Sequence, residues 1–511
     1  MSVETQEAII RFLAEPSTHH GAAVKRIDTH AASVFLAGPI AYKIKRAVKF
    51  PFLDFSTRDR RKSALDAEIE ANRPFAPELY IGVVPIARRN GTLAFSDEGD
   101  VVEWALKMHR FDEEKTLDHL ADAGRIDQAL IDTLARTVAA AHARAPLADA
   151  HRWIAALQNY IDQNDQELRG HTDLFDRTNI DALTSASRSA LEGVRPLLVA
   201  RGMQGLVRRG HGDLHLGNIA FIEGRPVPFD ALEFDPVIAS GDVLYDLAFL
   251  LMDLVERKLN EAANTVLNVY LGTTHRPSDL DALAALPLFM SLRAAIRAKV
   301  TAAKYLNARD DTGAAIKTAA RAYFALALDL IQPAAPRLIA IGGLSGTGKS
   351  VLARALAPKL APSPGAVLLR SDVERKAMFA VAEHEVLPQH AYATEVSKRV
   401  YATLADQARR VSAAGHSAIV DAVFAREDER AAMFDVARVG RFDFRGLFLT
   451  ADLRTRITRV GDRVHDASDA DATVARQQEG YKLGVMDWTE IDASGTPEQT
   501  LARVTASLGL S

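Results

Sequence analysis

The sequence predicts two domains of different fold class, an α+β N-terminal domain and an α/β C-terminal domain built on a parallel sheet. The first observation is the length of 511 residues, which exceeds what one hydrophobic core usually organises. The second is a change from short alternating segments to helical spacing near residue 114. The third is the alternation of strand-like and helix-like segments after residue 336. We therefore expect domains at 1–331 and 338–511, joined by the linker QPAAPR at 332–337.

Composition places the chain among ordinary folded proteins and removes several classes of site. Apolar residues make up 48% and charged residues 25% of the sequence, which is the balance of a globular protein. The absence of cysteine excludes disulfides, zinc–thiolate sites and thiol catalysis. A net charge of −4 provides no general attraction to nucleic acid or to an anionic membrane. With no basic and apolar leader and no uncharged run of about 20 residues, we expect a cytoplasmic protein without a membrane partner.

The first hundred residues predict a small lobe rich in strands. The segment SVFLAGPIAYKIKR, residues 33–46, indicates two short strands around a Gly-Pro turn. A helix with a Ser/Thr cap is expected at 56–72. Further strands are expected in the segments that follow it, 79–87, 91–95 and 101–108. A helical lobe comes next, interrupted by strands and loops around 205–236.

A motif in the helical lobe has the spacing of a catalytic loop for phosphoryl transfer. The stretch HGDLHLGN, residues 211–218, contains His-x-Asp followed five residues later by Asn, and it lies between strand-like segments. Such transfer needs a carboxylate to accept the proton of the alcohol, an amide oxygen for Mg²⁺, and a second carboxylate for metal. We assign Asp213 as the candidate catalytic base, and Asn218 and Asp230 as candidate Mg²⁺ ligands.

The small lobe should supply a lysine and a glutamate for the nucleotide phosphates. Alternation in AYKIKR sends Ala41, Lys43 and Lys45 to one face of a strand. The small residue two positions earlier favours Lys43, but Lys45 shares its face, so both remain candidates. Glu68, on the following helix, is the expected partner.

The N-terminal residues 1–331 resemble the aminoglycoside-phosphotransferase-like kinases, in the group found fused to a P-loop kinase in bacterial chains. The resemblance is carried by AYKIK, PFLDFST, HGDLHLGN, FDALEFD and GDVLYDLAFLLMDL. It implies a protein-kinase-like bilobal fold and an adenine-holding hinge in WALKMHRF, with Met108 at the nucleotide. It also implies that His211 orients the catalytic loop and that Asp242 and Asp246 brace it.

Two departures from the protein-kinase pattern are visible. LAGP offers one glycine where a Gly-rich loop would stand, so a plainer hairpin must cover the phosphates. FDALEFD replaces Asp-Phe-Gly, and it offers Glu233 and Asp235 as further candidates for the metal site.

The second domain opens on a phosphate-binding loop of the Walker A type. GLSGTGKS follows the apolar strand LIAI and begins a helix, which is the context that this motif requires. Glycines let backbone N–H groups approach phosphate oxygens, the lysine binds the β/γ-phosphates, and the serine hydroxyl binds Mg²⁺. The candidate ATP-binding residues are Gly343, Ser345, Gly346, Thr347, Gly348, Lys349 and Ser350, with Ser350 also a metal ligand.

Later features of the same domain indicate which reaction a nucleotide at this loop would take part in. Asp372 and Arg375 lie one helical turn apart after a strand, where an open α/β sheet has its ligand crevice. Asp421, after another apolar run, is a candidate Walker B acid for Mg²⁺. The arginines of a predicted lid share one helical face and suit stabilisation of phosphoryl charge: Arg456, Arg459 and Arg463. Each feature also has a purely structural interpretation: Asp372 as a helix cap, Asp421 as a turn residue, and the arginines as a solvated helix face.

Residues 336–511 resemble the small P-loop kinases grouped with zeta toxin and the polynucleotide-kinase 5′-kinase domain, within the AAA family of ATP-binding proteins. Asp372 and Arg375 match the family's base and substrate-contacting arginine in spacing, and HDASDADATVARQQ, 465–478, matches the tail after the lid. The resemblance implies phosphoryl transfer to a hydroxyl, with Lys349, Arg375 and Arg459 assisting Asp372.

The sequence therefore predicts a bifunctional kinase with two sites that use ATP and Mg²⁺. The expected acceptors are small molecules with hydroxyl groups, and a nucleic acid is compatible with the C-terminal site without being demanded by it. The alternative is a nucleotide-regulated switch or ATPase whose N-terminal domain is a non-catalytic binding module.

Overall fold

The chain folds into two compact units, one of residues 1–157 and 198–250 and one of residues 158–197 and 251–511. We call these the first and second units. The computed structural model describes residues 3–29, 31–50, 53–233, 238–305, 312–383, 385–462 and 467–510. Helices with residues in both units are α5 (Ala150–Arg169), α6 (Arg177–Met203) and α7 (Val243–Glu256).

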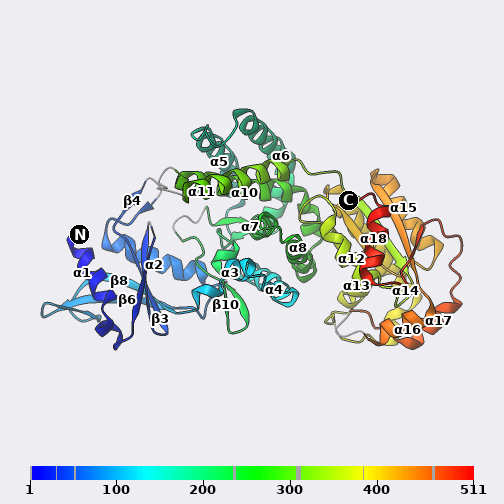
Figure 1. Ribbon diagram of the computed structural model, residues 1–511, viewed down its shortest axis with the longest axis horizontal. Helices are drawn as coiled ribbons and strands as arrows, with labels where there is room; N and C mark the ends of the chain where they lie inside the picture. Colours follow the sequence, from blue (N-terminus) through cyan, green and yellow to red (C-terminus); the bar gives the residue numbers. More distant parts are fainter. Residues whose placement is uncertain are drawn as a thin grey trace. The chain divides into compact units, whose positions relative to one another are not determined.

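The first unit contains a six-stranded antiparallel sheet in the order β1-β2-β3-β8-β6-β7 (Figure 1). Its strands are β1 (Val24–Asp28), β2 (Ala32–Ala37), β3 (Ile40–Lys45), β6 (Tyr80–Arg89), β7 (Thr92–Phe95) and β8 (Asp100–His109). Helix α2 (Arg58–Asn72) packs against β3, β6 and β8. The Thr57 side chain accepts a hydrogen bond from the Arg60 amide and so caps α2. The strands and the capped helix expected in this lobe are confirmed.

The remaining elements of the first unit are shorter strands and further helices. They are α1 (Val3–Ala14), η1 (Pro16–His19), β4 (Lys49–Phe50), β5 (Leu53–Asp54), η2 (Glu113–Lys115), α3 (Leu117–Asp122), α4 (Gln128–Arg144), β9 (Val207–Arg209), η3 (Leu216–Asn218), β10 (Ile219–Ile222), β11 (Arg225–Pro228) and β12 (Ser240–Asp242). Strand β9 pairs with β12, and β10 pairs with β11, so the motif of residues 211–218 runs between two small ribbons.

The second unit contains a five-stranded parallel sheet in the order β14-β15-β13-β16-β17. Its strands are β13 (Arg337–Gly343), β14 (Val367–Arg370), β15 (Ala418–Asp421), β16 (Asp443–Thr450) and β17 (Thr489–Asp492). Ile339 and Ile341 of β13 pack against α12 (Lys349–Leu356) and α18 (Pro497–Ser507) on one face. The predicted parallel α/β architecture is confirmed.

Helices complete the second unit around this sheet. They are α8 (Asn260–Thr274), α9 (Pro277–Asp281), η4 (Ala282–Ala285), α10 (Leu286–Tyr305), α11 (Thr312–Ile331), η5 (Ala357–Lys359), α13 (Ser371–Met378), η6 (Gln389–Tyr392), α14 (Thr394–Ala413), α15 (Glu427–Gly440), α16 (Leu453–Gly461), α17 (Ala472–Gln477) and η7 (Gln478–Gly480). Because α11 ends at Ile331 and β13 begins at Arg337, the expected linker lies between two regular elements. The domain limits at 331 and 338 stay a prediction.

Edge strand β14 is covered by side chains of α8 rather than by another strand. The Asn268 side chain accepts a hydrogen bond from the Leu368 amide over 2.7 Å and donates to the Ala366 carbonyl over 3.1 Å. Asn264, which is buried, donates to the same carbonyl over 3.0 Å. Two asparagines thus satisfy backbone groups that a neighbouring strand would otherwise pair.

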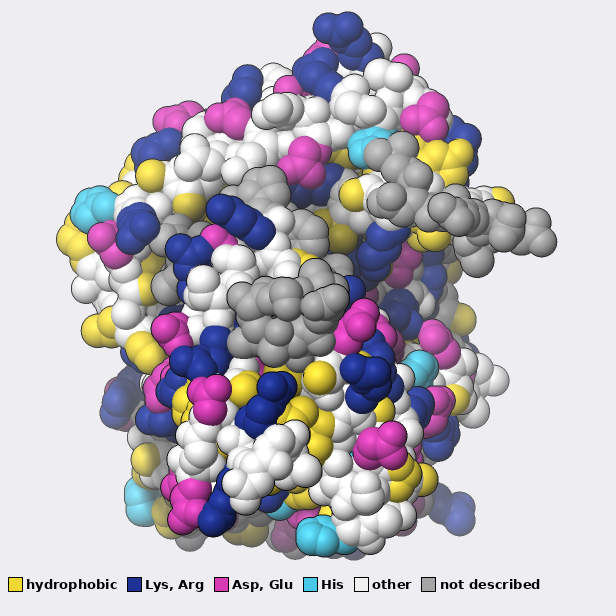
Figure 2. Space-filling view, turned by 90° about the vertical axis from the view of Figure 1, so that its left-hand side faces the viewer, with side chains coloured by type: hydrophobic (Ala, Val, Ile, Leu, Met, Phe, Trp, Pro, Cys, Tyr) yellow, Lys and Arg dark blue, Asp and Glu magenta, His cyan; other side chains and the backbone are white. Residues whose placement is uncertain are grey.

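The surface carries charges of both signs. On the face shown in Figure 2, lysine and arginine side chains are interspersed with aspartate and glutamate among the described residues. Within the described ranges, no helix has the length and apolar character needed to cross a membrane.

Buried His416 predicts an acid-sensitive second unit. Its Nε2 lies 2.8 Å from the Gly365 carbonyl, and burial lowers its pKa from 6.5 to about 4. Because the unfolded chain takes up this proton first, the free energy of unfolding should fall between pH 6.5 and 4. The loss reaches at most about 3 kcal/mol.

Denaturant unfolding of the wild type and His416→Gln at pH 7 and pH 5 measures this contribution. Glutamine can still donate to Gly365 but does not titrate, so we expect the variant to lose less stability at pH 5 than the wild type. Equal losses would show that His416 does not contribute to the acid sensitivity.

Candidate functional sites

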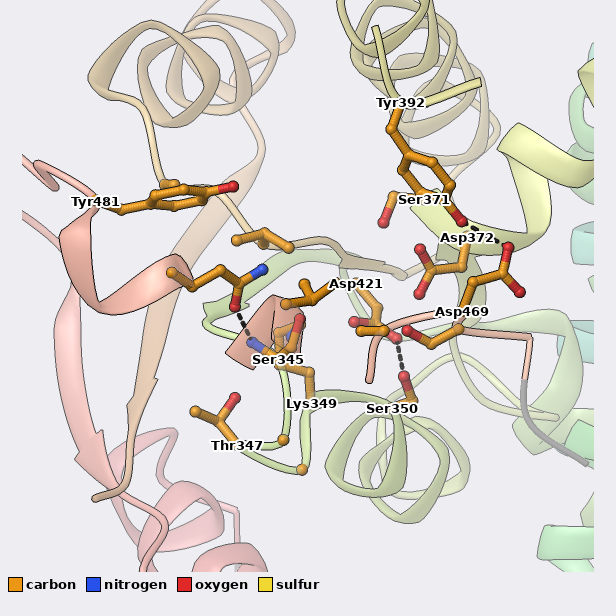
Figure 3. A pocket seen from close by; sticks show the side chains of 18 of the residues that line it. Ser345, Thr347, Lys349, Ser350, Ser371, Asp372, Tyr392, Asp421, Asp469 and Tyr481 are labelled. Atoms are coloured by element: carbon orange, nitrogen blue, oxygen red, sulfur yellow. Dashed lines mark hydrogen bonds between the residues drawn. The ribbon is translucent and has the colours of Figure 1, made fainter. Parts of the chain in front are cut away.

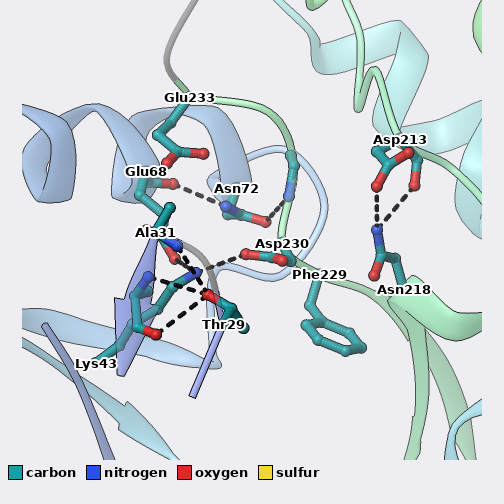
Figure 4. Close-up of polar contacts among 12 residues, drawn as sticks. Thr29, Ala31, Lys43, Glu68, Asn72, Asp213, Asn218, Phe229, Asp230 and Glu233 are labelled. Atoms are coloured by element: carbon teal, nitrogen blue, oxygen red, sulfur yellow. Dashed lines mark hydrogen bonds and ion pairs between the residues drawn. The ribbon is translucent and has the colours of Figure 1, made fainter. Parts of the chain in front are cut away.

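The catalytic-loop motif brings Asp213 and Asn218 together in the first unit (Figure 4). The Asn218 side-chain amide donates to Oδ2 of Asp213 over 2.9 Å and to the Asp213 carbonyl over 3.0 Å. Nε2 of His215 lies 3.4 Å from the same carboxylate. Five residues of loop therefore fold back so that the candidate base and the candidate metal ligand are in contact.

Asp246 braces this loop from helix α7. Its carboxylate accepts hydrogen bonds from the amides of His211 and Gly212, both at 2.8 Å, and lies 3.0 Å from Nε2 of His142. A Cβ at Gly210 would lie 2.7 Å from the Asp246 carboxyl carbon, so glycine permits this close approach. Nε2 of His211 lies 2.9 Å from the Phe229 carbonyl, which places it between the loop and the Asp230 segment.

Asp242 forms a separate buried contact beside the catalytic loop. The guanidinium of Arg201 donates to both of its carboxylate oxygens, over 2.6 and 2.8 Å. The family resemblance implied that both Asp242 and Asp246 brace the catalytic loop. Asp246 contacts the loop directly, whereas these contacts of Asp242 are with Arg201, so its bracing role stays a prediction.

Both candidate lysines contact Glu68. The sequence left open whether Lys43 or Lys45 is its partner, and the structure pairs Glu68 with both. Nζ of Lys43 lies 2.8 Å from Oε1 of Glu68, and Nζ of Lys45 lies 2.7 Å from Oε2. Lys43 also contacts Asp230 at 2.7 Å, whereas Lys45 contacts Glu233 at 2.5 Å. Figure 4 shows the side chain of Lys43 reaching Asp230. The expected lysine–glutamate pair is therefore present twice.

The charges of this group hold one another ionised. Burial alone would raise the pKa of Glu68, but Lys43 and Lys45 hold that pKa below its usual value. Burial opposes the charge of Lys43 as well, yet Asp230 and Glu68 raise its pKa well above the ordinary range. The Lys43 ammonium also lowers the pKa of Asp230. Lys43, Glu68 and Asp230 are therefore charged near neutral pH.

Asp230 itself has a left-handed backbone with φ of 60°. That conformation is unfavourable for a residue with a side chain, so neighbouring contacts must hold it. The Asp230 amide donates to the Tyr80 hydroxyl over 3.1 Å, and the Ala231 amide donates to Oδ1 of Asn72 over 3.0 Å. Of the two further metal candidates, Glu233 contacts Lys45, and Asp235 lies outside the described residues.

Met108, the residue expected at the adenine hinge, lies near the end of β8. It pairs in register with Ala41 of β3 and Tyr80 of β6, and its buried side chain joins the cluster that contains Leu36 and Leu65. A role at the nucleotide stays a prediction.

In the second unit, the phosphate-binding loop joins β13 to α12. Backbone φ is positive at Gly343, Gly346 and Gly348. A Cβ at Gly346 would lie 2.5 Å from the Arg456 carbonyl oxygen, so the loop passes directly under the backbone of α16. Nζ of Lys349 lies 3.3 Å from the Leu344 carbonyl, inside the curve of the loop. The backbone thus has the conformation that exposes N–H groups to phosphate.

Oxygen ligands suited to Mg²⁺ meet at the start of α12. The Ser350 hydroxyl donates to Oδ2 of Asp421 over 2.6 Å, and Nε of Arg370 lies 3.4 Å from the same oxygen. Hydroxyl and carboxylate oxygens are ligands that Mg²⁺ accepts, so this pair fits the ion (Figure 3). The expected Ser350–Asp421 combination is brought together.

Asp372 lies in the first turn of α13 and lines the same cavity. Burial, and then the Asp421 carboxylate, raises its pKa, while Lys349 and Arg370 oppose that rise. A raised pKa makes the ionised carboxylate a better proton acceptor. Arg375 follows one turn later, where it donates to the Ala391 carbonyl over 2.7 Å and lies 5.0 Å from the Tyr392 ring.

The expected arginine face of α16 has two described members with different surroundings. Arg456 is buried and donates to the Ala475 carbonyl over 2.7 Å. Arg459 lines the cavity but donates to the carbonyls of Ala493 and Gly495 over 2.8 and 2.6 Å. Arg463 lies outside the described residues. A phosphoryl-stabilising role for Arg459 stays a prediction.

The cavity around the phosphate loop has a volume of about 1040 Å³. Some of the residues that line it were not among the site residues predicted from the sequence. Gln478 accepts a hydrogen bond from the Ser345 amide over 2.6 Å, and Tyr392 donates to Asp469 over 2.6 Å. Tyr481 faces the cavity in Figure 3. Asp469 and Gln478 lie in the stretch 465–478 that carries part of the family resemblance, but nothing in the sequence placed them at this cavity, and no local motif marks Tyr392 or Tyr481.

The two folds and their sites define the class of the protein, a kinase. Residues 52–286 match the model of the family described as "Phosphotransferase enzyme family", and residues 338–483 match the family described as "AAA domain". The chain therefore joins a phosphotransferase-family kinase domain to a P-loop nucleotide-binding kinase domain.

Proteins from two mycobacteria match this chain along most of its length, and two solved structures match parts of it. Uncharacterized proteins from Mycobacterium tuberculosis and Mycobacterium bovis are each 27% identical over 487 residues, which is 93% of this chain and 93% of theirs. A choline/ethanolamine kinase family protein from Mesorhizobium loti is 15% identical with a TM-score of 0.37, covering 64% of this chain and 99% of its own. A sugar kinase from a Janibacter species is 18% identical with a TM-score of 0.28, covering 34% and 96%. The assignment rests on the two family matches.

Gly346→Ala should weaken nucleotide binding at the phosphate loop by about tenfold or more, since the methyl group meets the Arg456 backbone and the residue has φ of 88°. Gly415→Ala is the matched control, because its φ is 74° but a Cβ there meets nothing within 4 Å. Calorimetry with a non-hydrolysable ATP analogue, in a chain that also carries Asp230→Asn, measures the effect. Equal affinities for the two variants would contradict the packing argument.

Proposed function

We propose that the chain is a bifunctional phosphotransferase that moves the γ-phosphate of ATP to hydroxyl groups at two separate sites, using Mg²⁺ at each. The observation that supports this proposal is that each compact unit contains its own candidate base together with its own candidate residues for binding metal or phosphate. Asp213, Asn218 and Asp230 belong to the first unit, and Lys349 and Asp372 belong to the second. Neither set lacks a part that the other supplies.

In the first unit, Asp213 accepts the proton of the acceptor hydroxyl. The hydroxyl oxygen forms a bond to the γ-phosphorus, and the bond between the γ-phosphorus and the oxygen that bridges it to the β-phosphate breaks. Asn218 orients the Asp213 carboxylate through the 2.9 Å hydrogen bond and, with Asp230, would hold the metal. Lys43, which contacts both Glu68 and Asp230, would direct its ammonium to the nucleotide phosphates. Mg²⁺, when bound, neutralises charge on the transferring group.

In the second unit, Asp372 accepts the proton of a different acceptor. The amides of the glycine loop and Lys349 bind the β- and γ-phosphates, while Ser350 and Asp421 would hold the metal. Arg375 lines the cavity beside Asp372 and fits the acceptor side, and Arg459 fits the nucleotide side. Small molecules with hydroxyl groups are the proposed acceptors, and a nucleic-acid end is compatible with the second site.

Two single substitutions test for two independent activities. We expect Asp213→Asn and Lys349→Ala each to abolish one set of products, by roughly 10²-fold or more, and to leave the other set unchanged. The measurement is phosphoryl transfer from γ-labelled ATP into a metabolite pool, with RNA and DNA oligonucleotides added as separate acceptors.

The same experiment separates the proposal from a nucleotide-dependent switch. A switch would hydrolyse ATP without labelling any hydroxyl acceptor in the intact chain, and Asp213→Asn would then change nothing.

A further inference from the structure

Five charged side chains in the first unit form one continuous chain of ion pairs. In order, Asp230 contacts Lys43, Lys43 contacts Glu68, Glu68 contacts Lys45, and Lys45 contacts Glu233, with N···O distances of 2.5–2.8 Å. Glu68 belongs to α2 and both lysines belong to β3, whereas Asp230 and Glu233 belong to the segment after β11. Two separate ion pairs therefore join that segment to β3, and the same two lysines contact Glu68 of α2.

The two lysines differ in depth and in surroundings. The Lys45 side chain is 3% exposed and its ammonium lies 5.6 Å from the centre of the Phe55 ring, while the Lys43 side chain is 14% exposed. Their carboxylate partners differ in exposure in the same order, because the Asp230 side chain is 47% exposed and the Glu233 side chain is 11% exposed. Lys43 and Asp230 form the outer pair, open to a ligand, and Lys45 and Glu233 form the inner pair.

The outer pair cannot be kept unchanged during phosphoryl transfer. Lys43 has to direct its ammonium to phosphate oxygens, and Asp230 has to direct its carboxylate to metal, so their mutual contact weakens when both are engaged. The strained backbone of Asp230 still needs support in that state. The inner pair is the charged contact that remains available for this purpose.

We propose that Lys45 and Glu233 are positioning residues that hold the Asp230 segment against Glu68 while Lys43 and Asp230 bind nucleotide and metal. This inference rests on the proposed function of the first unit. It assigns the two lysines of AYKIKR different tasks, phosphate binding for Lys43 and positioning for Lys45. It also assigns Glu233 to a lysine rather than to the metal, although the sequence offered it as a ligand.

The test uses the full chain with Lys349→Ala, so that the second unit contributes neither nucleotide binding nor transfer. Calorimetry measures how the binding of a non-hydrolysable ATP analogue depends on Mn²⁺ for Glu233→Gln, Lys45→Met and the double variant. We expect each single variant to need about tenfold more Mn²⁺ for half-maximal binding, as loss of a residue that orients a ligand does. The double variant should be no worse than either single variant, because the two residues act as one pair.

Controls separate positioning from other roles. Lys45→Arg keeps the charge, so its Mn²⁺ requirement should be close to that of the chain with an unchanged Lys45. Glu70→Gln alters an exposed glutamate on α2, the helix of Glu68, and should not change the Mn²⁺ requirement. If Glu233 were a metal ligand, Glu233→Gln would raise the Mn²⁺ requirement while Lys45→Met would not. Unchanged Mn²⁺ dependence in Glu233→Gln, with a wild-type circular dichroism spectrum, would overturn the inference.

Transfer activity distinguishes the failure of this inference from the failure of the proposed function. If Asp213-dependent transfer occurs and the Mn²⁺ dependence is unaffected by either variant, only the positioning role is wrong. If no Asp213-dependent transfer occurs, the proposed function of the first unit fails, and the binding measurement still decides the role of the pair.

Discussion

The fully buried carboxylate of Glu68 is the constraint on which the small lobe depends. A buried charge without a partner costs several kcal/mol, so each of its oxygens needs a cation, and β3 supplies two. Because β strands send every second side chain to one face, Lys43 and Lys45 reach the same carboxylate from adjacent positions. Helix, sheet and the Asp230 segment are thereby tied to one point, and moving α2 away would break both lysine contacts of the Glu68 carboxylate.

The two proposed sites would hold phosphate by different physical means. The first unit uses long charged side chains, whose reach spans a gap between a sheet, a helix and a loop. The second uses backbone amides, which require glycine at positive φ and a neighbouring backbone close enough to exclude any side chain, as at Gly346 under Arg456. A lysine can follow a displaced phosphate by changing its rotamer, whereas the amides of a backbone cradle move only with the loop that carries them.

Much of the fold and many of the site residues could be predicted because they follow local rules. Alternation indicated β3, a Thr cap indicated α2, and motif spacing brought Asp213 to Asn218 and Ser350 to Asp421. The rest depends on contacts between distant segments. Helical periodicity placed Arg456 and Arg459 on one face, but it could not indicate that Arg456 is buried against the Ala475 carbonyl. Gln478 reaches the Ser345 amide from another element, and Lys45 meets Glu233 only after the lobe has assembled.

The asparagines of α8 that cover edge strand β14 have a consequence for how the chain is made. Asn264 and Asn268 precede Leu368 by about a hundred residues, and synthesis proceeds from the N-terminus, so their helix has left the ribosome before the strand appears. An uncovered strand edge invites pairing with other chains. Here the cover is synthesised first, so the asparagines of α8 are available to pair this strand edge as soon as β14 has left the ribosome.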